Sequence, residues 1–384
     1  MARTCALGAQ GREFKSRRPD TNAFLLYNNL HMATPEKKPY LIIPLLIEQP
    51  TWGGEYICEK KGWLEKPMLK GKKIGQSYEL YSKSVLAASI TSSKDVLFST
   101  RVEEAFPISA FLEDKPFPLI KFTQAKGNSF QIHIPQGIHN SFWHPKAESW
   151  YFFEDGKMTF GIKKGINTDK YKEICLLIDA EMKRLSKEVE KKIISKEQAE
   201  ESVHIFIQGK NPWQFVNEYK TKKGDVVDLS GGGIHHSWED DKDNTRGNIV
   251  FEVQQDEMDS VSTMRSFDQG KFLKDGATRE LQIEEYFKYI DTNKEKNSLK
   301  MQQNDPVLFN TPFYVLKKRT IEKKEELNTM QSFHHLFVNE GEAFVRSNNG
   351  QVHISQGHSC FIPKGIEYSI EVEKKCELLQ TSIK

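Results

Sequence analysis

Four side chains that can bind a metal ion occur at spacings that could bring them together on strands. Gln131 and His133 are two residues apart, so on a β-strand an amide and an imidazole face the same side. Glu148 follows in another strand-like run, and His235 ends a glycine-rich stretch about a hundred residues later. Taken alone, each of these residues is more often structural than a ligand. Together, one amide, two imidazoles and one carboxylate suit a borderline divalent ion, and zinc is the first choice.

The segments that must position these residues have the pattern of short β-strands. Between residues 40 and 160, apolar runs are separated by glycine, proline and asparagine, which favours a barrel or sandwich over alternating strands and helices. Further strand-like runs follow residue 203 and residue 305. The predicted strands are 41–43, 77–81, 87–90, 130–134, 150–153, 204–207, 224–229, 249–253, 313–316, 336–338, 343–346, 352–354, 360–362 and 368–372.

Residues 167–202 have a different period. Asn167 is a suitable N-cap, and after it apolar residues such as Tyr171, Ile174 and Ile178 recur every three to four positions. This pattern predicts a helical insertion of one or two amphipathic helices that end before residue 203. We expect the helices to pack on the flank of a barrel rather than on a membrane or a partner helix. A shorter helix is predicted at residues 283–290.

The chain is expected to contain a larger and a smaller β-domain. We predict a first domain at residues 32–291 that includes the helical insertion at residues 167–202. A polar stretch at residues 292–305 is predicted to be a linker, and a second domain follows at residues 306–384.

The second domain repeats part of the first. Residues 357–368 parallel residues 224–235, with Tyr368 in the place of His235. The second domain is therefore expected to share the small-barrel layout and to lack the matching ligand. The pair His334-His335 is interpreted as core or surface rather than as a second metal site.

Residues 1–31 differ from the rest of the chain, because they have no periodicity and no apolar core of signal-peptide length. Two interpretations are open. Codons for Phe14-Lys15-Ser16-Arg17 can match the T-arm of a transfer-RNA gene, which would make the segment a gene-calling artefact before a true start at Met32. The alternative is an ordinary disordered tail.

The composition excludes several classes of protein. The 384 residues carry a net charge of +2 with basic and acidic residues interleaved, so nothing indicates a nucleic acid partner. No segment approaches the roughly 18 uninterrupted apolar residues of a membrane span. The 5 cysteines are scattered without a Cys-x-x-Cys pair, which is typical of reduced thiols in a cytoplasmic protein. The sequence contains no signal for an oligomeric state.

A series of short motifs follows one order from residue 40 to the end. They are Trp52-Gly53-Gly54, Ile74-Gly75-Gln76-Ser77-Tyr78-Glu79, Phe117-Pro118-Leu119-Ile120-Lys121, Gln131-Ile132-His133, Lys146-Ala147-Glu148-Ser149-Trp150-Tyr151, Gly224-Asp225 with Gly232 and His235, Glu252-Val253-Gln254-Gln255, Arg265, Asp268 and Arg279-Glu280-Leu281-Gln282-Ile283-Glu284. Each motif is weak alone. In this order and spacing, the chain resembles the type I mannose-6-phosphate isomerases, metal-dependent enzymes built on cupin barrels.

This resemblance implies a mainly β fold of tandem cupin (jelly-roll) barrels with a helical insertion. It also implies a zinc-dependent aldose–ketose isomerase that interconverts mannose 6-phosphate and fructose 6-phosphate, a small phosphosugar pair, through an enediol. One Zn²⁺ per chain would be held by Gln131, His133, Glu148 and His235.

The same resemblance implies that Lys146, Glu252 and Arg265 line the substrate pocket. Moving a proton between C1 and C2 of a sugar needs a base and positive charge near the enediolate. We assign the base to Glu252 and the positive charge to zinc and Arg265. Lys146 would hold the phosphate or polarise a sugar oxygen. Without the resemblance, Lys146 and Arg265 would be interpreted as members of surface ion pairs.

The chain departs from the family pattern around the pocket, which bears on the identity of the substrate. Glu252 and Arg265 are about three residues further apart than in the family. Other departures are Ile134-Pro135-Gln136 in place of Pro-Asp-Asp, a loop with His139 and His144, Ser230 in place of a proline and His236 in place of a small residue.

Two other functions stay open. One is a metal-binding cupin isomerase that acts on another sugar. The other is a sugar-binding cupin without catalysis, which would have little need to keep four ligands together with Lys146 and Arg265.

Overall fold

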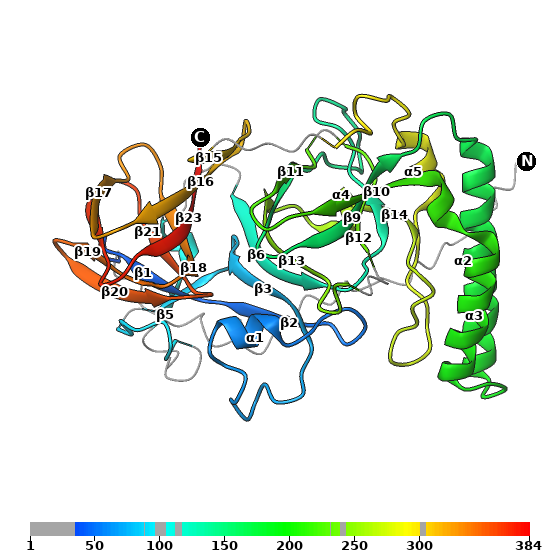
Figure 1. Cartoon of the computed structure of the whole chain (residues 1–384), viewed down its shortest axis with the longest axis horizontal. Coiled ribbons are helices and arrows are strands. Elements are labelled where there is room, and N and C mark those ends of the chain that lie inside the picture. Colours follow the sequence, from blue (N-terminus) through cyan, green and yellow to red (C-terminus); the bar gives the residue numbers. More distant parts are fainter. Residues whose placement is uncertain are drawn as a thin grey trace, which may run out of the picture. The chain divides into compact units, whose positions relative to one another are not determined.

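The structure is a computed structural model that describes residues 35–87, 89–96, 105–111, 117–230, 232–238, 243–299 and 305–384. The two interpretations of residues 1–31 therefore concern a segment outside the described residues, as does Gly231 of the glycine-rich stretch. The described part is mainly β, as predicted, and its strands form antiparallel sheets (Figure 1).

A central sheet is buried on both faces and carries much of the site. Successive side chains on its strands alternate between the two faces. Phe122, Tyr151 and Phe251 belong to the core shared with the C-terminal strands, whereas Trp150 and Phe152 belong to a separate core on the other side. The strand order is β11 (Val226–Asp228), β8 (Glu148–Phe152), β13 (Asn248–Gln255), β6 (Pro118–Ala125), β3 (Ile74–Leu80) and β2 (Leu45–Glu48).

A second sheet completes the first β-domain. Met158 and Phe160 on its β9 pack with Trp150 and Phe152 of the central sheet. Because the side chains between the two sheets come from both, residues facing this space can converge on one site. The strand order is β10 (Val216–Thr221), β9 (Gly156–Ile162), β12 (His235–Ser237), β7 (Phe130–Ile132) and β14 (Met264–Phe267).

The second β-domain also contains two sheets around one apolar core. Its larger sheet has the order β15 (Val307–Asn310), β16 (Tyr314–Ile321), β23 (Cys376–Ile383), β18 (His334–Glu340), β21 (Ser359–Ile362), β1 (Tyr40–Ile43), β4 (Val85–Ala87) and β5 (Ala105–Pro107). The smaller sheet has the order β17 (Lys324–Asn328), β22 (Glu367–Glu371), β19 (Glu342–Ser347) and β20 (Gly350–Ser355). These pairs of sheets are compatible with tandem cupin barrels.

Three strands near the start of the described chain join the C-terminal sheet. β1 pairs with β21, where Tyr40 lies opposite Phe361, and β4 and β5 extend the sheet from β1. Figure 1 shows the blue β1 beside the orange and red strands. The predicted division of the chain into two domains at residues 292–305 stays a prediction. Strands from both sides of this segment pair with each other, as β1 does with β21. The start of that segment is itself packed, because Asn297 is buried and its Oδ1 accepts a hydrogen bond from Ile162 N at 2.8 Å.

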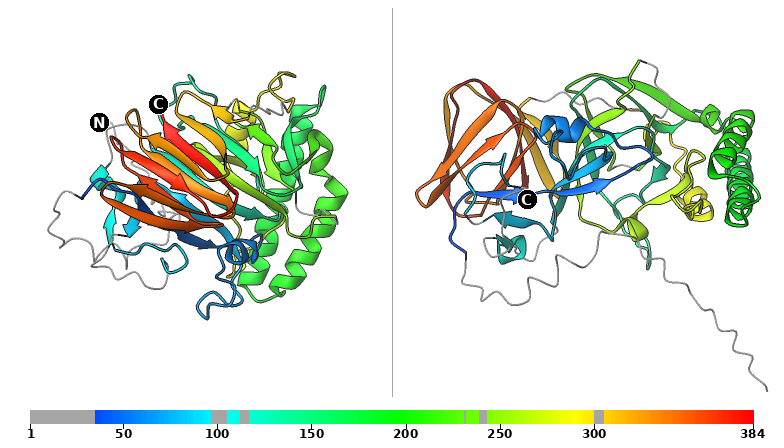
Figure 2. Two further views of the ribbon diagram at one scale, coloured as in Figure 1. Left: turned by 60° about the vertical axis from the view of Figure 1, so that its left-hand side comes forward. Right: turned by 90° about the horizontal axis from the view of Figure 1, so that it is seen from below.

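Two helices, α2 (Thr168–Glu190) and α3 (Lys196–Lys210), form the predicted insertion and lie side by side (Figure 2). Asn167 is the N-cap of α2 and accepts a hydrogen bond from Lys170 N at 2.9 Å. The insertion is longer than predicted, and the strand predicted at 204–207 is wrong. Those residues complete α3, because a capping box at Ser195 starts this helix and Val203 and Ile207, four residues apart, both enter the core.

Shorter helices connect the strands. They are α1 (Tyr56–Lys60), η3 (Ile108–Phe111), η4 (Pro212–Phe215), α4 (Asp259–Ser262) and α5 (Ile283–Tyr289), the last of which confirms the helix predicted at 283–290. The other predicted strands overlap observed ones, although the strand predicted at 87–90 is displaced to β4. Cys58, Cys175, Cys360 and Cys376 are free and buried. Among the helices of the described ranges, none is long and apolar enough to cross a lipid bilayer.

Tyr368 of the second domain is engaged locally. Its hydroxyl lies 2.7 Å from His334 Nδ1, and its side chain is buried on β22. His335, the neighbour of His334, faces the other way and stacks on Phe251 of the central sheet. Within the described residues, the second domain contributes no residue to a metal-binding cluster.

A buried ion pair lies between the two β-domains. Lys61 Nζ is 2.7 Å from Glu79 Oε1 and also donates to the carbonyl of Gly357, and both charged side chains are at most 1% exposed. Glu79 further accepts hydrogen bonds from Ser77 at 2.5 Å and from Ser359 of β21 at 2.9 Å. Because Glu79 points away from the space between the first domain's sheets, this motif residue holds the domains together and is not part of the site.

Substituting Lys61→Met should lower the free energy of unfolding by about 3–5 kcal/mol, because the carboxylate of Glu79 would stay buried without its cation. Urea unfolding followed by tryptophan fluorescence measures this change. The double substitution Lys61→Met with Glu79→Leu removes both charges and should recover most of the loss. A single variant as stable as the parent would contradict a structural role for the pair.

Candidate metal centre

Three of the four predicted ligands converge between the two sheets of the first domain. His133 follows β7, Glu148 begins β8 and His235 begins β12. One nitrogen or oxygen atom from each lies within 4.8 Å of the others, and all three side chains are buried. Neighbouring ligands of a tetrahedral zinc ion are roughly 3.3 Å apart, and His133 Nε2 and Glu148 Oε2, at 3.2 Å, have this separation.

The two histidines direct lone pairs toward this cluster. His133 Nδ1 lies 2.7 Å from the carbonyl of Ser262, which can only accept, so Nδ1 carries the proton. Its Nε2 then faces Glu148 Oε2 at 3.2 Å. His235 Nδ1 is 3.3 Å from the carbonyl of Gly233, and its buried Nε2 has no hydrogen-bond partner among the described residues. A cation between these atoms would satisfy both rings and the carboxylate.

The charge states suit a metal ligand set. Burial, reinforced by His133, lowers the pKa of His235 to about 3, so the ring is neutral at neutral pH. Burial opposes ionisation of Glu148, yet Lys146 and His133 hold the pKa of its carboxyl well below its usual range. Metal binding needs a neutral imidazole and an ionised carboxyl group, which are the forms that the fold favours at His235 and Glu148.

Glu148 is held in place by two further side chains. Trp150, two residues along β8, faces the same side and donates from Nε1 to Glu148 Oε1 at 2.8 Å. Lys146 Nζ lies 3.2 Å from Glu148 Oε2. These contacts fix the carboxylate on the side of the two histidines.

Gln131, the fourth predicted ligand, lies beside the cluster. It is directly opposite His235 across β7 and β12 and opposite Arg265 across β7 and β14. Gln131 also lines the cavity described next. Gln131 is therefore a neighbour of His235, and its role as a metal ligand stays a prediction.

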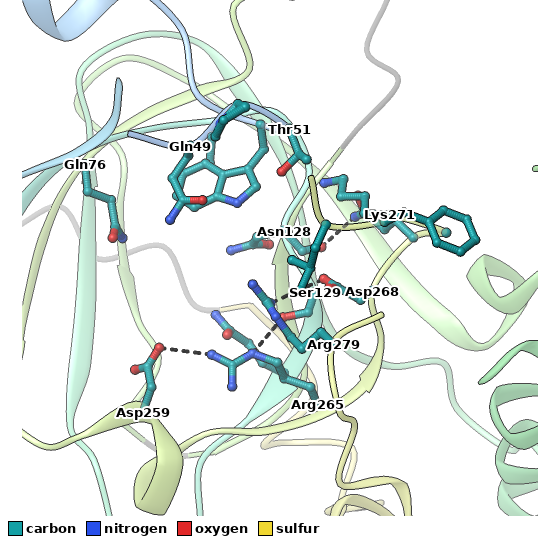
Figure 3. A pocket seen from close by; sticks show the side chains of 18 of the residues that line it. Gln49, Thr51, Gln76, Asn128, Ser129, Asp259, Arg265, Asp268, Lys271 and Arg279 are labelled. Atoms are coloured by element: carbon teal, nitrogen blue, oxygen red, sulfur yellow. Dashed lines mark hydrogen bonds and ion pairs between the residues drawn. The ribbon is translucent and has the colours of Figure 1, made fainter. Parts of the chain in front are cut away.

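A cavity of about 790 Å³ opens beside the cluster. All three predicted pocket residues, Lys146, Glu252 and Arg265, line it together with Gln131 and Glu148. Figure 3 shows Arg265 and Arg279 close to Ser129, with Gln49 and Gln76 across the cavity. The cavity also extends to α3 and to the segment after β14, through Lys196, Glu200, His204, Asp268, Lys271 and Lys274.

The longer spacing between Glu252 and Arg265 does not remove Arg265 from the cavity. The short helix α4 occupies the intervening segment, and Arg265 follows on β14. Its guanidinium is 3.0 Å from Asp259 Oδ2 and donates to Ser129 Oγ at 3.1 Å. His139 and His144, which the sequence placed in a loop near the pocket, are not among the cavity-lining residues, and His144 instead lies 3.1 Å from Glu257.

Several charged residues of the cavity were missed as site residues at the level of sequence, and two of them, Asp259 and Lys121, contact predicted ones. Asp259 lies 3.6 Å from Lys146 Nζ and also contacts Arg265, so it joins two of the predicted residues. Nothing in its local sequence signals this contact. Lys121 Nζ lies 3.3 Å from Glu252 Oε2. A lysine in the buried strand β6 is unusual, and this was the sequence signal that could have identified Lys121 as a site residue.

Comparison with known proteins supports the fold. Residues 307–383, which contribute β15 to β23 of the second β-domain, match the family model described as "Mannose-6-phosphate isomerase, cupin domain". No curated protein sequence matches the chain significantly.

Solved structures of mannose 6-phosphate isomerases resemble most of the chain. The Bacillus subtilis protein is 15% identical with a TM-score of 0.61, over 90% of this chain and 99% of that chain. The Salmonella typhimurium protein, in a structure bound to its substrate and zinc, is 12% identical with a TM-score of 0.55, over 91% and 100%. The chain therefore has the fold of these isomerases, with a mannose-6-phosphate isomerase cupin domain at residues 307–383.

Substituting His235→Ala or Glu148→Gln should lower bound zinc from about one ion per chain to well below that, because each change removes one of few ligands. Metal analysis of the purified variants measures this. His144→Ala, which alters an exposed histidine outside the cluster, is the matched control and should keep its zinc. Unchanged stoichiometry in the cluster variants would refute the ligand assignment.

Substituting Trp150→Phe should weaken zinc binding by about 10–100-fold without abolishing it, because the hydrogen bond that orients Glu148 is lost while an aromatic ring remains. Competition with a zinc-sensitive chelating dye gives the dissociation constants. Equal affinities in the variant and the parent would show that Trp150 does not act through Glu148.

Proposed function

We propose that this chain is a zinc-dependent aldose–ketose isomerase that interconverts mannose 6-phosphate and fructose 6-phosphate through an enediol. The observation that carries the proposal is the buried cluster of His133, Glu148 and His235 beside a cavity that Lys146 and Glu252 line. A small substrate that reaches this cavity meets metal ligands, a carboxylate and fixed cations together.

The proposed zinc ligands are Gln131, His133, Glu148 and His235. The unpartnered Nε2 of His235 and the spacing of the cluster support the fit. Zinc bound there would polarise the sugar oxygens at C1 and C2 and stabilise negative charge on them. The Salmonella typhimurium structure, which shares this fold, contains zinc and fructose 6-phosphate, and this supports zinc as the metal.

Glu252 is the proposed base. Its carboxylate is buried beside Lys121, and burial raises its pKa, an effect that Lys121 opposes. A carboxylate with a raised pKa is a better base at neutral pH than an exposed one. It would take the proton from C2 of the aldose and return it to C1, while a hydroxyl proton moves from O2 to O1. The reverse reaction would use the same transfers.

Lys146 and Arg265 have separate proposed roles. Lys146 Nζ touches Glu148, so it lies at the metal end of the cavity, where it would donate a hydrogen bond to a sugar oxygen. Arg265 is fixed by Asp259 and Ser129, and its charge would help to balance the enediolate. Lys271 and Arg279 supply two further cations along the wall of the cavity for a phosphate group.

The proposed cellular location is the cytoplasm. The free and buried state of Cys58, Cys175, Cys360 and Cys376 supports a reducing compartment. Mannose 6-phosphate and fructose 6-phosphate are the proposed small-molecule partners.

A coupled assay with mannose 6-phosphate, run with and without a chelator, tests the proposal. We expect turnover that the chelator abolishes and added zinc restores. Turnover of another sugar, with none of mannose 6-phosphate, would favour an isomerase with a different substrate. Zinc retained without turnover of any sugar would favour the sugar-binding alternative.

Substituting Glu252→Gln should lower kcat by about 10²–10⁴-fold, because the amide cannot accept a proton, while zinc content stays near that of the parent. Glu257→Gln is a matched control, since this residue pairs with His144 and does not line the cavity. A Glu252→Gln variant with parental kcat would remove Glu252 from the role of base.

A further inference from the structure

His236 is a buried residue that the proposed chemistry does not use. It follows the proposed ligand His235 on β12. Consecutive residues of a strand point to opposite faces. His235 therefore faces the metal cluster, while His236 lies against Phe130 on the other face, with ring centroids 4.6 Å apart.

His236 is hydrogen-bonded on both sides of its ring. Its Nδ1 lies 3.0 Å from the hydroxyl of Thr159, its cross-strand partner on β9. Its Nε2 lies 2.6 Å from the side-chain nitrogen of Gln269, which also donates to the carbonyl of Asn128 at 2.6 Å. Since an amide nitrogen only donates, His236 accepts at Nε2 and carries its proton on Nδ1. The side chain of Asn128 accepts in turn from Ser237 N of β12 at 2.7 Å.

Gln269 occupies a strained position in a tight turn. Its φ is 58° and that of Gly270 is 73°, with Lys271 N bonded to the carbonyl of Asp268 at 3.2 Å. Two consecutive positive φ values define a type I′ turn, a backbone conformation that is unfavourable for a residue with a Cβ atom. A Cβ atom at Gly270 would lie 2.8 Å from Ile207 of α3, so the turn is also confined from the helix side.

The turn carries charged side chains of the cavity wall. It continues directly from β14, which bears Arg265. Asp268 accepts from Arg279 at 3.4 Å, and Lys271 Nζ donates to the carbonyl of Gly127 at 2.6 Å. Figure 3 shows Asp268, Lys271 and Arg279 gathered on one side of the cavity, near Asn128.

We propose that Gln269 is a positioning residue through which His236 and Asn128 hold the Asp268–Lys271 turn, and with it the cationic wall that receives the phosphate end of the substrate. One strand, β12, then fixes both ends of the substrate: His235 acts at the metal and His236 acts through Gln269 at the cationic wall. The role at the substrate rests on the proposed isomerase function, whereas the holding of the turn does not.

The variants Gln269→Ala and His236→Phe remove the two partners of this contact, and His236→Phe keeps a ring against Phe130. Gln269→Gly removes the amide and also the backbone strain. Gln214→Ala is the matched control, because its amide likewise donates to two backbone carbonyls but lies outside the cavity. All four are prepared as full chains loaded with zinc.

Hydrogen–deuterium exchange over residues 266–274 measures how readily the turn opens, and it needs no substrate. We expect exchange to accelerate at least about threefold in all three site variants and to stay unchanged in the control, because a lost hydrogen bond makes local opening easier. An exchange rate in Gln269→Gly equal to that of the parent would show that the side-chain amide does not stabilise the turn. Rates equal to the parent's in all three site variants would overturn the proposal.

Steady-state kinetics with mannose 6-phosphate reads out the effect on the substrate. We expect KM to rise about tenfold, as for loss of one positioning hydrogen bond, with kcat and zinc content within about twofold of the parent. Faster exchange with an unchanged KM would overturn the positioning role and leave a structural contact. If the parent turns over no mannose 6-phosphate, the proposed function fails, and the exchange result alone decides whether Gln269 holds the turn.

Discussion

Burial of the central sheet on both faces is the constraint on which the rest of this structure depends. One face packs through Phe122, Phe251 and their neighbours on the C-terminal strands, with Phe153 stacked on Phe337 at 5.6 Å. Polar side chains of β3, β6, β8 and β13 are therefore gathered mainly on the other face. That face looks into the space between the sheets of the first domain, so the fold concentrates charge and metal ligands there.

Confined charges must be paired, and the pairs give the cavity its geometry. One ion pair joins Lys121 of β6 to Glu252, which lies opposite it on β13. The other joins Lys146 to Glu148, the first residue of β8. Burying an ion without a partner costs several kcal/mol, so these pairings fix side chains that would otherwise be mobile. The nitrogens of His133 and His235 are left facing a carboxylate, which makes a divalent cation the natural complement of the cluster.

The second β-domain supports the first without repeating its chemistry. Tyr368, which parallels His235 in the sequence, bonds to His334 within its own domain. Glu79 of β3 uses its charge to pair with Lys61 between the domains. The two β-domains therefore have different roles. The first brings several potential metal ligands together, whereas the polar residues named here in the second make structural contacts.

The sequence by itself determined the mainly β class and most of the helical insertion, because these follow from period two and period three to four. Residue type and spacing also named His133, Glu148 and His235, which the fold brings close together. The closeness of Asp259 to Lys146 and Arg265, the pairing of Lys121 with Glu252 and the entry of β1, β4 and β5 into the C-terminal sheet were decided only by tertiary structure. Residues 204–207 show the reason most directly. Their apolar run fits a strand locally, yet burial of Val203 and Ile207 against the first domain makes it a helix, since packing outweighs local propensity.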